Sequence, residues 1–338
     1  MQIRLQLPSL PGELKGILSR KTILLLLLMM AILVVQAQPA ISQKTKDLFK
    51  AIRSGSSAEL ETQLKNGADA NDSLDGYSAL MGAALSGSAD QMKILIDNGA
   101  NVNFIAQSGI SALWLAAPDW DKTKLLLDHG ADAKHTVRGY GLLVKIAAMQ
   151  GTLSVTKLLI ENGADPKVAT PDNYLVYNAA ASGDTAILGF YLRKGFKAND
   201  TIFTGDYPIN GALFYRNSAT VKMLIDNGAD VNIQSKSFQL ISFNGFTPLM
   251  FAALNNDKAS FYYLLNHGAD PNRKNENGYT ALMLLQQADE DDPAMTKALL
   301  EHGADPVTKT LSGNNALYFA MQKGNTESVA ILKKYTTK

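Results

Sequence analysis

A glycine-centred motif that returns about every 33 residues constrains the fold of this chain more than any other feature. The motif reads NGAD, NGAN, HGAD or, once, KGFK, and successive glycines are 32, 31, 33, 32, 33, 40 and 35 residues apart. A fixed period of this length is typical of solenoids, in which one supersecondary unit is stacked many times. The glycines are Gly67, Gly99, Gly130, Gly163, Gly195, Gly228, Gly268 and Gly303.

Each repeat contains two short helical patterns. Ahead of the glycine lies an apolar face with the i, i+3, i+4 spacing of a helix, as at Met92, Leu95 and Ile96. Further upstream a leucine is followed by small residues, as in LMGAA from Leu80, and the alanines let neighbouring helices approach closely. Two helices this short cannot bury their faces alone. We therefore expect an all-α array in which every unit depends on its neighbours.

This layout resembles the ankyrin repeat. The stretches Asn244–Asn272 and Asp75–Asn103 match the family pattern of a turn, a TPLH-type helix start, a second helix and a GAD turn. The resemblance covers roughly Lys44 to Lys338, as about nine units with atypical first and last members. It implies a solenoid of helix–turn–helix units joined by β-hairpin-like turns, with a role in binding other proteins.

The sequence also departs from the family pattern. The histidine of TPLH is missing throughout, and in the family that side chain usually forms hydrogen bonds between repeats. Its loss either loosens the stacking or is compensated by the packing of the larger apolar residues. Units five and six, at about Asp172–Val231, are the weakest matches. The residues at the histidine position are Met81, Trp114, Val144, Met250, Met283 and Tyr318.

The motif HGAD, at residues 129–132, 267–270 and 302–305, raises the question of whether it carries chemistry. Asparagine or lysine takes the place of histidine in the other repeats, and neither asparagine nor a solvated lysine replaces an imidazole as a general base. A glycine just after a helix is the usual left-handed C-terminal cap, and the aspartate commonly bonds its own turn. His267 and His302 belong to stacked units and would lie about 10 Å apart, too far for one metal ion. We interpret HGAD as a structural turn.

Other candidates for chemistry are few. The chain has no cysteine, which excludes thiolate nucleophiles and cysteine-based zinc sites. His135 is expected to be a solvated turn residue. The acidic run Asp289–Asp292 lacks the spaced ligands and glycine of a calcium loop, so a solvated loop leading into a helix is the better interpretation. We expect no catalytic residue, no cofactor and no metal site.

The N-terminal segment has the pattern of a secretory signal peptide. A basic pair at residues 20–21 precedes thirteen apolar residues at 23–35, and small residues follow. As a helix the apolar run would cover about 20 Å, against about 30 Å for a hydrocarbon core. We expect residues 1–37 to be removed, which leaves an ankyrin-repeat domain at 38–338 that begins at Gln38. The alternative is an uncleaved signal anchor.

Charge and cysteine content are compatible with export. The net charge is +1, and removing residues 1–37 takes away four basic residues and one acidic residue, which leaves 28 against 30, or −2. Such a balance does not indicate nucleic-acid binding. A chain without cysteine folds equally well in an oxidising compartment. We expect a bacterial periplasmic or secreted monomer, with no stable insertion in a membrane after cleavage.

An aromatic stripe is the first candidate binding surface. In the ankyrin family the residue before the TPLH-type segment lies near the hairpin tip and often contacts partners. Six of eight such residues are aromatic here, and aromatic side chains supply a large contact area with few rotamers to freeze. The alternative is that each ring packs against the next hairpin. The residues are Tyr77, Ile110, Tyr140, Tyr174, Tyr207, Phe246, Tyr279 and Asn314.

An insertion is the second candidate. The 40-residue interval contains an extra segment at residues 235–244 that carries Phe238, Leu240, Ile241 and Phe243. Insertions in a solenoid map to loops on one face, often the binding face. Apolar residues in such a loop need cover, either from the solenoid itself or from a partner. Trp120, on the side of the loops between helices, is a third candidate.

Three functions therefore compete. The leading hypothesis is a non-catalytic module that binds a protein of unknown identity through its hairpin tips and groove. The alternative is a binder of glycans or small ligands that stacks sugar rings on the aromatic stripe. An enzyme is the least supported, because it would need two acidic side chains buried in one cleft with shifted pKa values.

Overall fold

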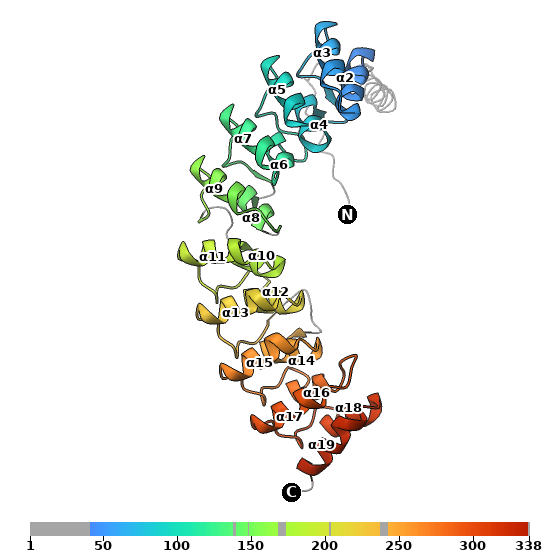
Figure 1. Cartoon of the computed structure of the whole chain (residues 1–338), viewed down its shortest axis with the longest axis vertical. Helices are drawn as coiled ribbons and strands as arrows, with labels where there is room; N and C mark the ends of the chain where they lie inside the picture. Colours follow the sequence, from blue (N-terminus) through green and yellow to red (C-terminus); the bar gives the residue numbers. More distant parts are fainter. Residues whose placement is uncertain are drawn as a thin grey trace, which may run out of the picture.

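The computed structural model describes residues 41–137, 140–147, 149–167, 174–202, 204–236 and 243–336. Its helices follow one another as antiparallel pairs that stack into a long curved column, with α2 at one end and α19 at the other (Figure 1). We call one helix pair with the turn that follows it a unit. The all-α solenoid predicted from the repeat is confirmed.

The first helices of the units line the concave side of the column, and the second helices line its convex side (Figure 1). The concave row is α2 (Gln43–Ser54), α4 (Ala79–Ser86), α6 (Ala112–Ala116), α8 (Leu142–Ala147), α10 (Tyr174–Ser182), α12 (Pro208–Phe214), α14 (Pro248–Leu254), α16 (Ala281–Leu285) and α18 (Ala316–Lys323). The convex row is α3 (Ser57–Lys65), α5 (Ala89–Asp97), α7 (Trp120–Asp128), α9 (Leu153–Glu161), α11 (Thr185–Arg193), α13 (Ser218–Asp226), α15 (Lys258–Asn266), α17 (Pro293–Glu301) and α19 (Thr326–Thr336).

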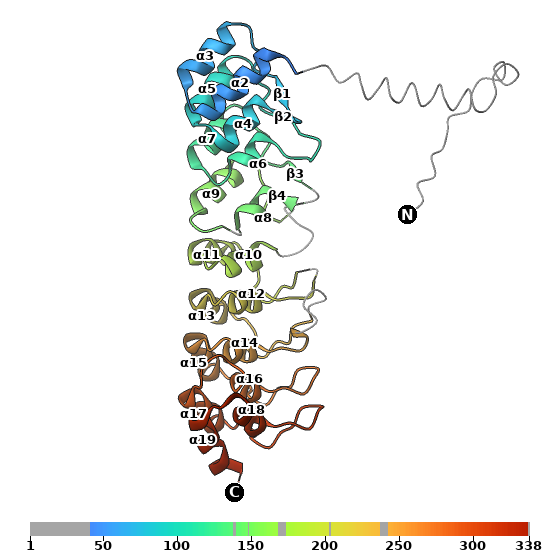
Figure 2. The same cartoon turned by 90° about the vertical axis from the view of Figure 1, so that its right-hand side faces the viewer.

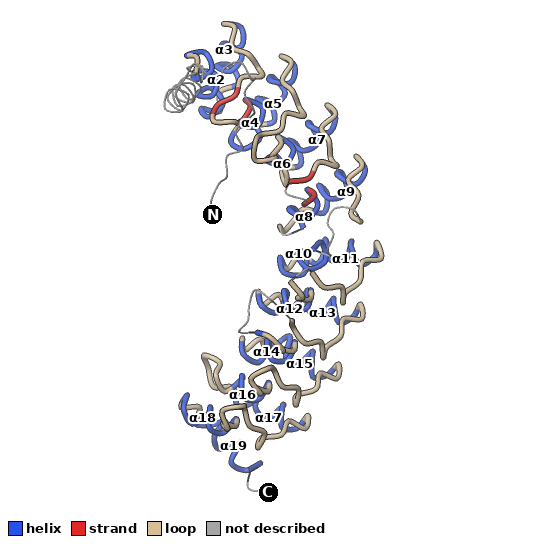
Figure 3. Tube along the Cα trace, turned by 180° about the vertical axis from the view of Figure 1, so that it is seen from behind, coloured by secondary structure: helices blue, strands red, loops and turns tan. Residues whose placement is uncertain are grey.

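The connections between units project along one edge of the column (Figure 2). Among the described residues they contain two short antiparallel hairpins, β1 (Ser73–Leu74) with β2 (Tyr77–Ser78), and β3 (Thr136–Val137) with β4 (Tyr140–Gly141). These strands appear as brief red segments beside α4 and α8 (Figure 3). The other described connections are turns of the same general shape, so the hairpin-like joining predicted from the family resemblance is present with very little regular sheet.

Local caps explain why such short helices form. The Ser78 hydroxyl accepts a hydrogen bond from the Met81 amide at 3.2 Å and so caps the start of α4. Ser88 and Gln91 form a reciprocal capping box at the start of α5. At the other end of α5, Gly99 has φ of +86°, and the Ala100 amide donates to the Leu95 carbonyl at 3.0 Å. This is the Schellman arrangement, which needs a residue without a Cβ at the left-handed position.

The interior is a continuous apolar core in which methionine fills the place of the missing TPLH histidine. Met81, Met250 and Met283 are all buried between helices. Trp114 is half-buried, and Tyr318 is exposed because it lies in the final unit. A flexible, unbranched side chain fills an irregular gap well. Packing therefore compensates for the lost histidine in at least these three units.

Asparagine side chains join consecutive GAD turns. Asn232 Nδ2 donates to the Gly268 carbonyl at 3.0 Å, and Asn232 Oδ1 accepts from the Asp270 amide at 2.7 Å. We call this pair of bonds a rung. Rungs of the same kind are made by Asn71, Asn103, Asn199 and Asn272.

The rungs are interrupted in the middle of the column. Lys134 and Lys167 occupy the rung position, and lysine has no acceptor for the amide of the next turn. At the opposite edge these units are still joined. Lys145 Nζ donates to the Ala117 carbonyl at 3.0 Å, and Gln150 Nε2 donates to the Ser182 carbonyl at 2.8 Å. The middle units are thus tied at the edge of the helix–helix loops and lack rungs at the edge of the GAD turns.

Two predictions from the sequence lie outside the described residues. These are the signal peptide at 1–37 and most of the insertion, at residues 237–242. Within the described residues, no helix combines the length and apolar character needed to cross a bilayer.

Candidate interaction surface

The histidines of HGAD cap helices. His129 Nδ1 lies 2.8 Å from the Leu125 carbonyl oxygen, and His267 Nδ1 lies 2.7 Å from that of Tyr263. The carbonyl only accepts, so Nδ1 carries the proton in both rings. Asn227 Nδ2 makes the same i−4 bond to Met223 at 2.8 Å. Histidine and asparagine are interchangeable at this position because both offer a short N–H donor to the last turn.

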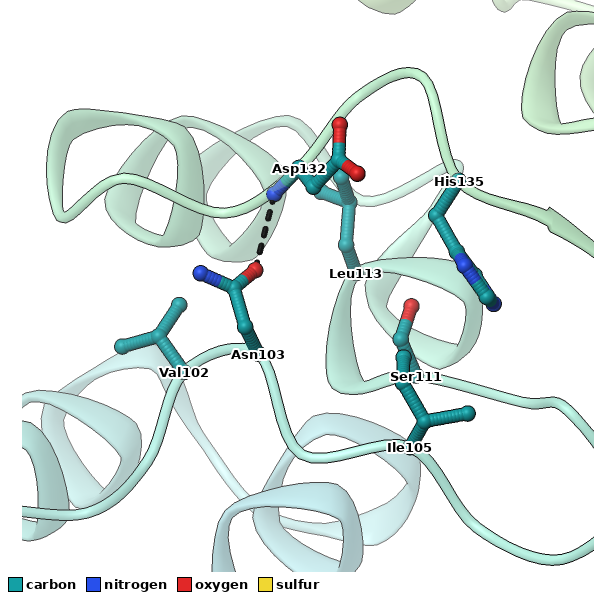
Figure 4. Close-up of a pocket in the computed structure, with 7 residues that line it drawn as sticks. All are labelled: Val102, Asn103, Ile105, Ser111, Leu113, Asp132 and His135. Carbon is teal, nitrogen blue, oxygen red and sulfur yellow. Dashed lines mark hydrogen bonds between the residues drawn. The ribbon is translucent and has the colours of Figure 1, made fainter.

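His135 differs from its expected role as a solvated turn residue. It is half-buried, and its Nε2 lies 2.7 Å from the Gly109 carbonyl oxygen of the preceding unit. It lines a hollow of about 120 Å³ beside the Asn103 rung, together with Val102, Ile105, Ser111, Leu113 and Asp132 (Figure 4).

The acidic run at 289–292 divides into two structural and two exposed residues. Asp292 caps α17 by accepting from the Met295 amide at 2.9 Å, and it forms an ion pair with Lys258 at 2.8 Å. Asp291 accepts hydrogen bonds from backbone amides and the Ser328 hydroxyl in the first turn of α19. Asp289 and Glu290 are exposed in the loop between α16 and α17. No group of three or more potential metal ligands occurs in the part of the chain that the structure describes.

The aromatic stripe has a different register from the one expected. Tyr77 stands at a hairpin tip and is 37% exposed. Tyr207, however, is the N-cap of α12, the position held by Thr247 in α14, and Tyr174 is the first residue of α10. The hairpin-tip position before α12 therefore belongs to Asp206. In these two units, which lack the TPLH motif, the expected position is therefore one residue too late at Tyr207 and two residues too late at Tyr174.

Several rings of the stripe pack against the solenoid. Phe246 is only 4% exposed, and Tyr279 lies with its ring centroid 5.4 Å from that of Phe319 in the next unit. Tyr174 and Tyr207 are half-buried against the core. For these residues the structure favours the local-packing alternative. The side chains of Tyr140, Phe238 and Leu240 lie outside the described residues.

The described end of the insertion also packs on the solenoid. Phe243 lies 5.1 Å from Phe246, 5.4 Å from Phe251 and 6.1 Å from Phe214, measured between ring centroids. Tyr215 adds a fifth ring, 5.2 Å from Phe214. We call these five residues the aromatic cluster. It joins the insertion to the last residues of α12 and to α14, both in the concave row.

Two rings of the aromatic cluster are open to solvent. Phe214 is 43% exposed and Tyr215 is 61% exposed. Sequence reasoning missed both of them, although their position was available as a signal. They follow the small-residue segment of α12 directly, as Leu85 and Ser86 do in α4, where the first helix of a unit reaches the concave surface.

A half-buried acidic group, Asp206, anchors the start of the insertion. The Asp206 carboxylate accepts from the Tyr207 amide at 3.0 Å and from Asn210 Nδ2 at 3.2 Å, and it bonds the hydroxyls of Ser235 and Tyr177. Burial raises the pKa of Asp206 above its usual range, although these hydrogen bonds oppose the shift. Burial also raises the pKa of the Tyr177 hydroxyl, and the nearby Asp206 charge adds to this effect. The groups around Asp206 are hydroxyls and an amide.

Trp120 lines a shallow groove on the other side of the column. The groove holds about 580 Å³ and runs across the starts of α7, α9 and α11, where Leu153, Lys157 and Asp184 line it. The indole is exposed. Because the Gly151 amide donates to Asp184 at 2.7 Å, one acidic group of the groove already has a structural role.

Comparison with known proteins agrees with this architecture. A family model described as ankyrin repeats (3 copies) matches residues 48–137, 144–235, 176–275, 211–310 and 249–338. These matches cover far more than half of the chain, so the protein belongs to the ankyrin-repeat family. Ankyrin repeats generally mediate interactions between proteins and are typically not catalytic.

Two curated relatives share part of the sequence. The rat ankyrin repeat and SAM domain-containing protein 6 is 35% identical over 77 residues, which are 23% of this chain and 8% of the relative. Ankyrin repeat-containing protein P1E11.10 of Schizosaccharomyces pombe is 29% identical over 113 residues, or 33% of this chain and 49% of the relative. The chain thus matches less than half the length of either relative.

Proposed function

We propose that the chain is a non-catalytic array of about nine ankyrin units that holds a partner protein against its concave surface and hairpin tips. The observation that carries the proposal is the exposure of Phe214 and Tyr215 on the concave side, in contact with the insertion through Phe243. Exposed aromatic rings on a rigid scaffold are typical anchors of protein interfaces because they bury a large area at low entropic cost.

The titratable groups support binding over catalysis. A carboxylate-based enzyme would need two acids in one cleft with separated pKa values. Asp206 has a raised pKa, but it is surrounded by Tyr177, Asn210 and Ser235, and its hydrogen bonds hold two units and the insertion together. Asp292, which is buried, caps a helix and pairs with Lys258. The hydrogen bonds of Asp206 and Asp292 therefore give both carboxylates a structural role.

We further propose that the protein acts in the periplasm or outside the cell. The support is the basic pair at 20–21, the short apolar run at 23–35 and the absence of cysteine. The test is to determine the N-terminal residue of the protein purified from its own host. We expect Gln38, whereas an intact Met1 would contradict export with cleavage.

The binding function is tested by affinity capture from native envelope extract. The bait is the full chain with a C-terminal tag, beside a variant with Phe214→Ser and Tyr215→Ser. A matched control, Tyr262→Ser with Tyr335→Ser, removes two exposed rings from α15 and α19. All three baits must show the same helical signal and melting.

We expect the native bait and the control to retain the same protein in equal amounts. The Phe214/Tyr215 variant should retain about tenfold less of it, as expected for the loss of two interface anchors. Retention by all three baits would keep the binding function and move the contact to the hairpin tips, with Tyr77→Ser as the next variant. If no bait retains a protein and the native chain binds immobilised glycans, the function is glycan binding and the proposal is wrong.

A further inference from the structure

The unit of α18 and α19, the last in the described part of the chain, exposes a surface that inner units cover with their neighbours. Tyr318 in α18 stands at the TPLH-histidine position, where Met81 and Met250 are completely buried, yet Tyr318 is 43% exposed. Met321 in α18 is 59% exposed, whereas Ala253, at the same position of α14, is completely buried. We call this apolar surface the end face, and it consists of Val307, Leu317, Tyr318, Met321 and Val329.

The turn after α17 extends the end face to the turn edge of the column. The rung position, two residues after the GAD aspartate, holds Asn232 and Asn272 in the two preceding turns and Val307 here. Val307 is exposed, and its side chain has neither a donor nor an acceptor, so this turn cannot form a rung with another turn. The last described turn therefore presents apolar surface where inner turns present an amide.

The opposite end of the array is polar. Lys46, which is exposed on α2, holds the position at which Gly82 in α4 faces the preceding unit, where an added Cβ would lie 3.4 Å from Phe49. Burying a lysine against an apolar surface is unfavourable. The α2 end of another copy therefore does not suit the end face, and head-to-tail stacking of copies is disfavoured.

The charges of α19 suit a second copy of the same helix. Glu327 lies in the first turn of α19 and Lys334 in the last, and both side chains are exposed. Seven residues make almost two full turns, so the two charges project from the same side of the helix. If two copies of α19 run antiparallel, Glu327 of each copy lies beside Lys334 of the other. Such exposed pairs add little affinity, but they select the antiparallel direction.

We infer that the chain forms a twofold dimer in which the end faces of two copies cover each other, with the two α19 helices antiparallel. Terminal units of a solenoid need a polar outer surface for solubility, and the end face lacks one. A second copy supplies the cover that a neighbouring unit supplies inside the array, and a twofold contact closes without leading to a filament. The dimer differs from the monomer that we expected from the sequence. It does not rest on the proposed function, since α14 and α16 separate the aromatic cluster from the end face.

The first test is the mass of the full chain, measured by sedimentation equilibrium. The end variant is Tyr318→Lys with Met321→Lys, which adds two charges to the end face. Its matched control is Tyr262→Lys with Met149→Lys, which adds the same charges at another exposed tyrosine and methionine. We expect the native chain and the control to be dimeric at about 20 µM, and the dimer of the end variant to have a dissociation constant at least about tenfold higher. All three must show the same helical signal and melting.

The second test locates the contact by cross-linking. Because the chain has no cysteine, a single introduced thiol reacts alone. Met321→Cys treated with a bismaleimide should give a covalent dimer, whereas Lys50→Cys, on an exposed position of α2, should not. A native chain that stays monomeric at about 100 µM, equal dissociation constants for the end variant and its control, or equal cross-linking of both thiols would each overturn the inference. Since capture of a native partner is measured separately, the proposed function can survive any of these results.

Discussion

The middle of the column and its C-terminal half are built from the same unit but are joined differently. From Asn199 onward, Asn199, Asn232 and Asn272 each tie one GAD turn to the next with two hydrogen bonds. At Lys134 and Lys167 the rung is absent, and the bonds between units lie at the opposite edge. The second helices have the same length in both regions: α9, α11, α13, α15 and α17 each contain nine residues.

The difference shows that unit formation and unit coupling depend on separate residues. The apolar helix faces and the left-handed glycine that ends each second helix suffice to form a unit, and they persist from Gly67 to Gly303. Coupling at the turn edge depends on one side chain that both donates and accepts. In a solenoid, stability is the sum of unit and interface contributions, so a missing rung weakens one interface and leaves the units intact.

The proposed binding surface lies on the strongly coupled half. The aromatic cluster extends over α12 and α14, whose units are joined by the Asn232 rung. A rigid scaffold places contact residues with less entropy to lose on binding. The tie between Asp206 and Ser235 holds the start of the insertion to the same half.

Removing a rung is the change with the largest expected effect. Asn232→Ala deletes two bonds between turns and should lower the free energy of unfolding by about 1–2 kcal/mol, as for two partly exposed hydrogen bonds. Lys167→Ala, at the same position in the middle, should change it by no more than about 0.5 kcal/mol. Urea unfolding followed by circular dichroism measures both. Equal effects of the two substitutions would contradict the role given to the rung.

Restoring a rung is the converse experiment, with a smaller effect. Lys167→Asn offers Gly195 and the turn after it a donor and an acceptor, and should raise the free energy of unfolding by about 0.5–1 kcal/mol. Lys167→Gln is the matched control, because its longer amide has the same groups at the wrong distance. If both variants behave alike, the middle interface is not limited by the missing asparagine.

The smallest effect concerns pH. Burial raises the pKa of Asp206 in the folded state, so the folded chain holds this proton more tightly than the unfolded chain. The protonated Asp206 carboxyl therefore contributes to the free energy of unfolding in acid. This contribution is lost as the pH rises from about 4 through the raised pKa, and it is absent at neutral pH. Asp206→Asn should be more stable than the native chain at pH 7, with the advantage gone near pH 3. Urea titrations across this pH range measure both chains. If Asp206→Asn were more stable than the native chain at pH 3 but not at pH 7, the predicted sign of the pH dependence would be wrong.

Much of the fold was predictable because its signals are local and repeated. The period of the glycines, the i, i+3, i+4 faces and the capping residues each act within one unit, so the sequence predicts helices such as α5 and α13 directly. The structural interpretation of HGAD was also accessible, since histidine, asparagine and lysine alternate at one position. His135 was predicted less well, because its partner Gly109 lies in the preceding unit.

The candidate site was predicted only in part because it depends on contacts between units. The insertion was evident from the spacing, but the contact of its Phe243 with Phe214 joins residues of two different units. The hairpin-tip position was assigned wrongly at Tyr174 and Tyr207. In these units the TPLH motif is absent, and α10 and α12 begin without a serine or threonine cap.

Native-state hydrogen exchange, followed by mass spectrometry on the full chain, tests most directly whether the asparagine rungs divide the array into two regions of different stability. We expect the amides of α8 to α10 to exchange through openings of lower free energy than those of α12 to α16, because local stability follows the coupling between neighbouring units. Lys167→Asn should narrow this difference. Uniform protection along the column, or faster exchange in α12 to α16 than in α8 to α10, would contradict the division.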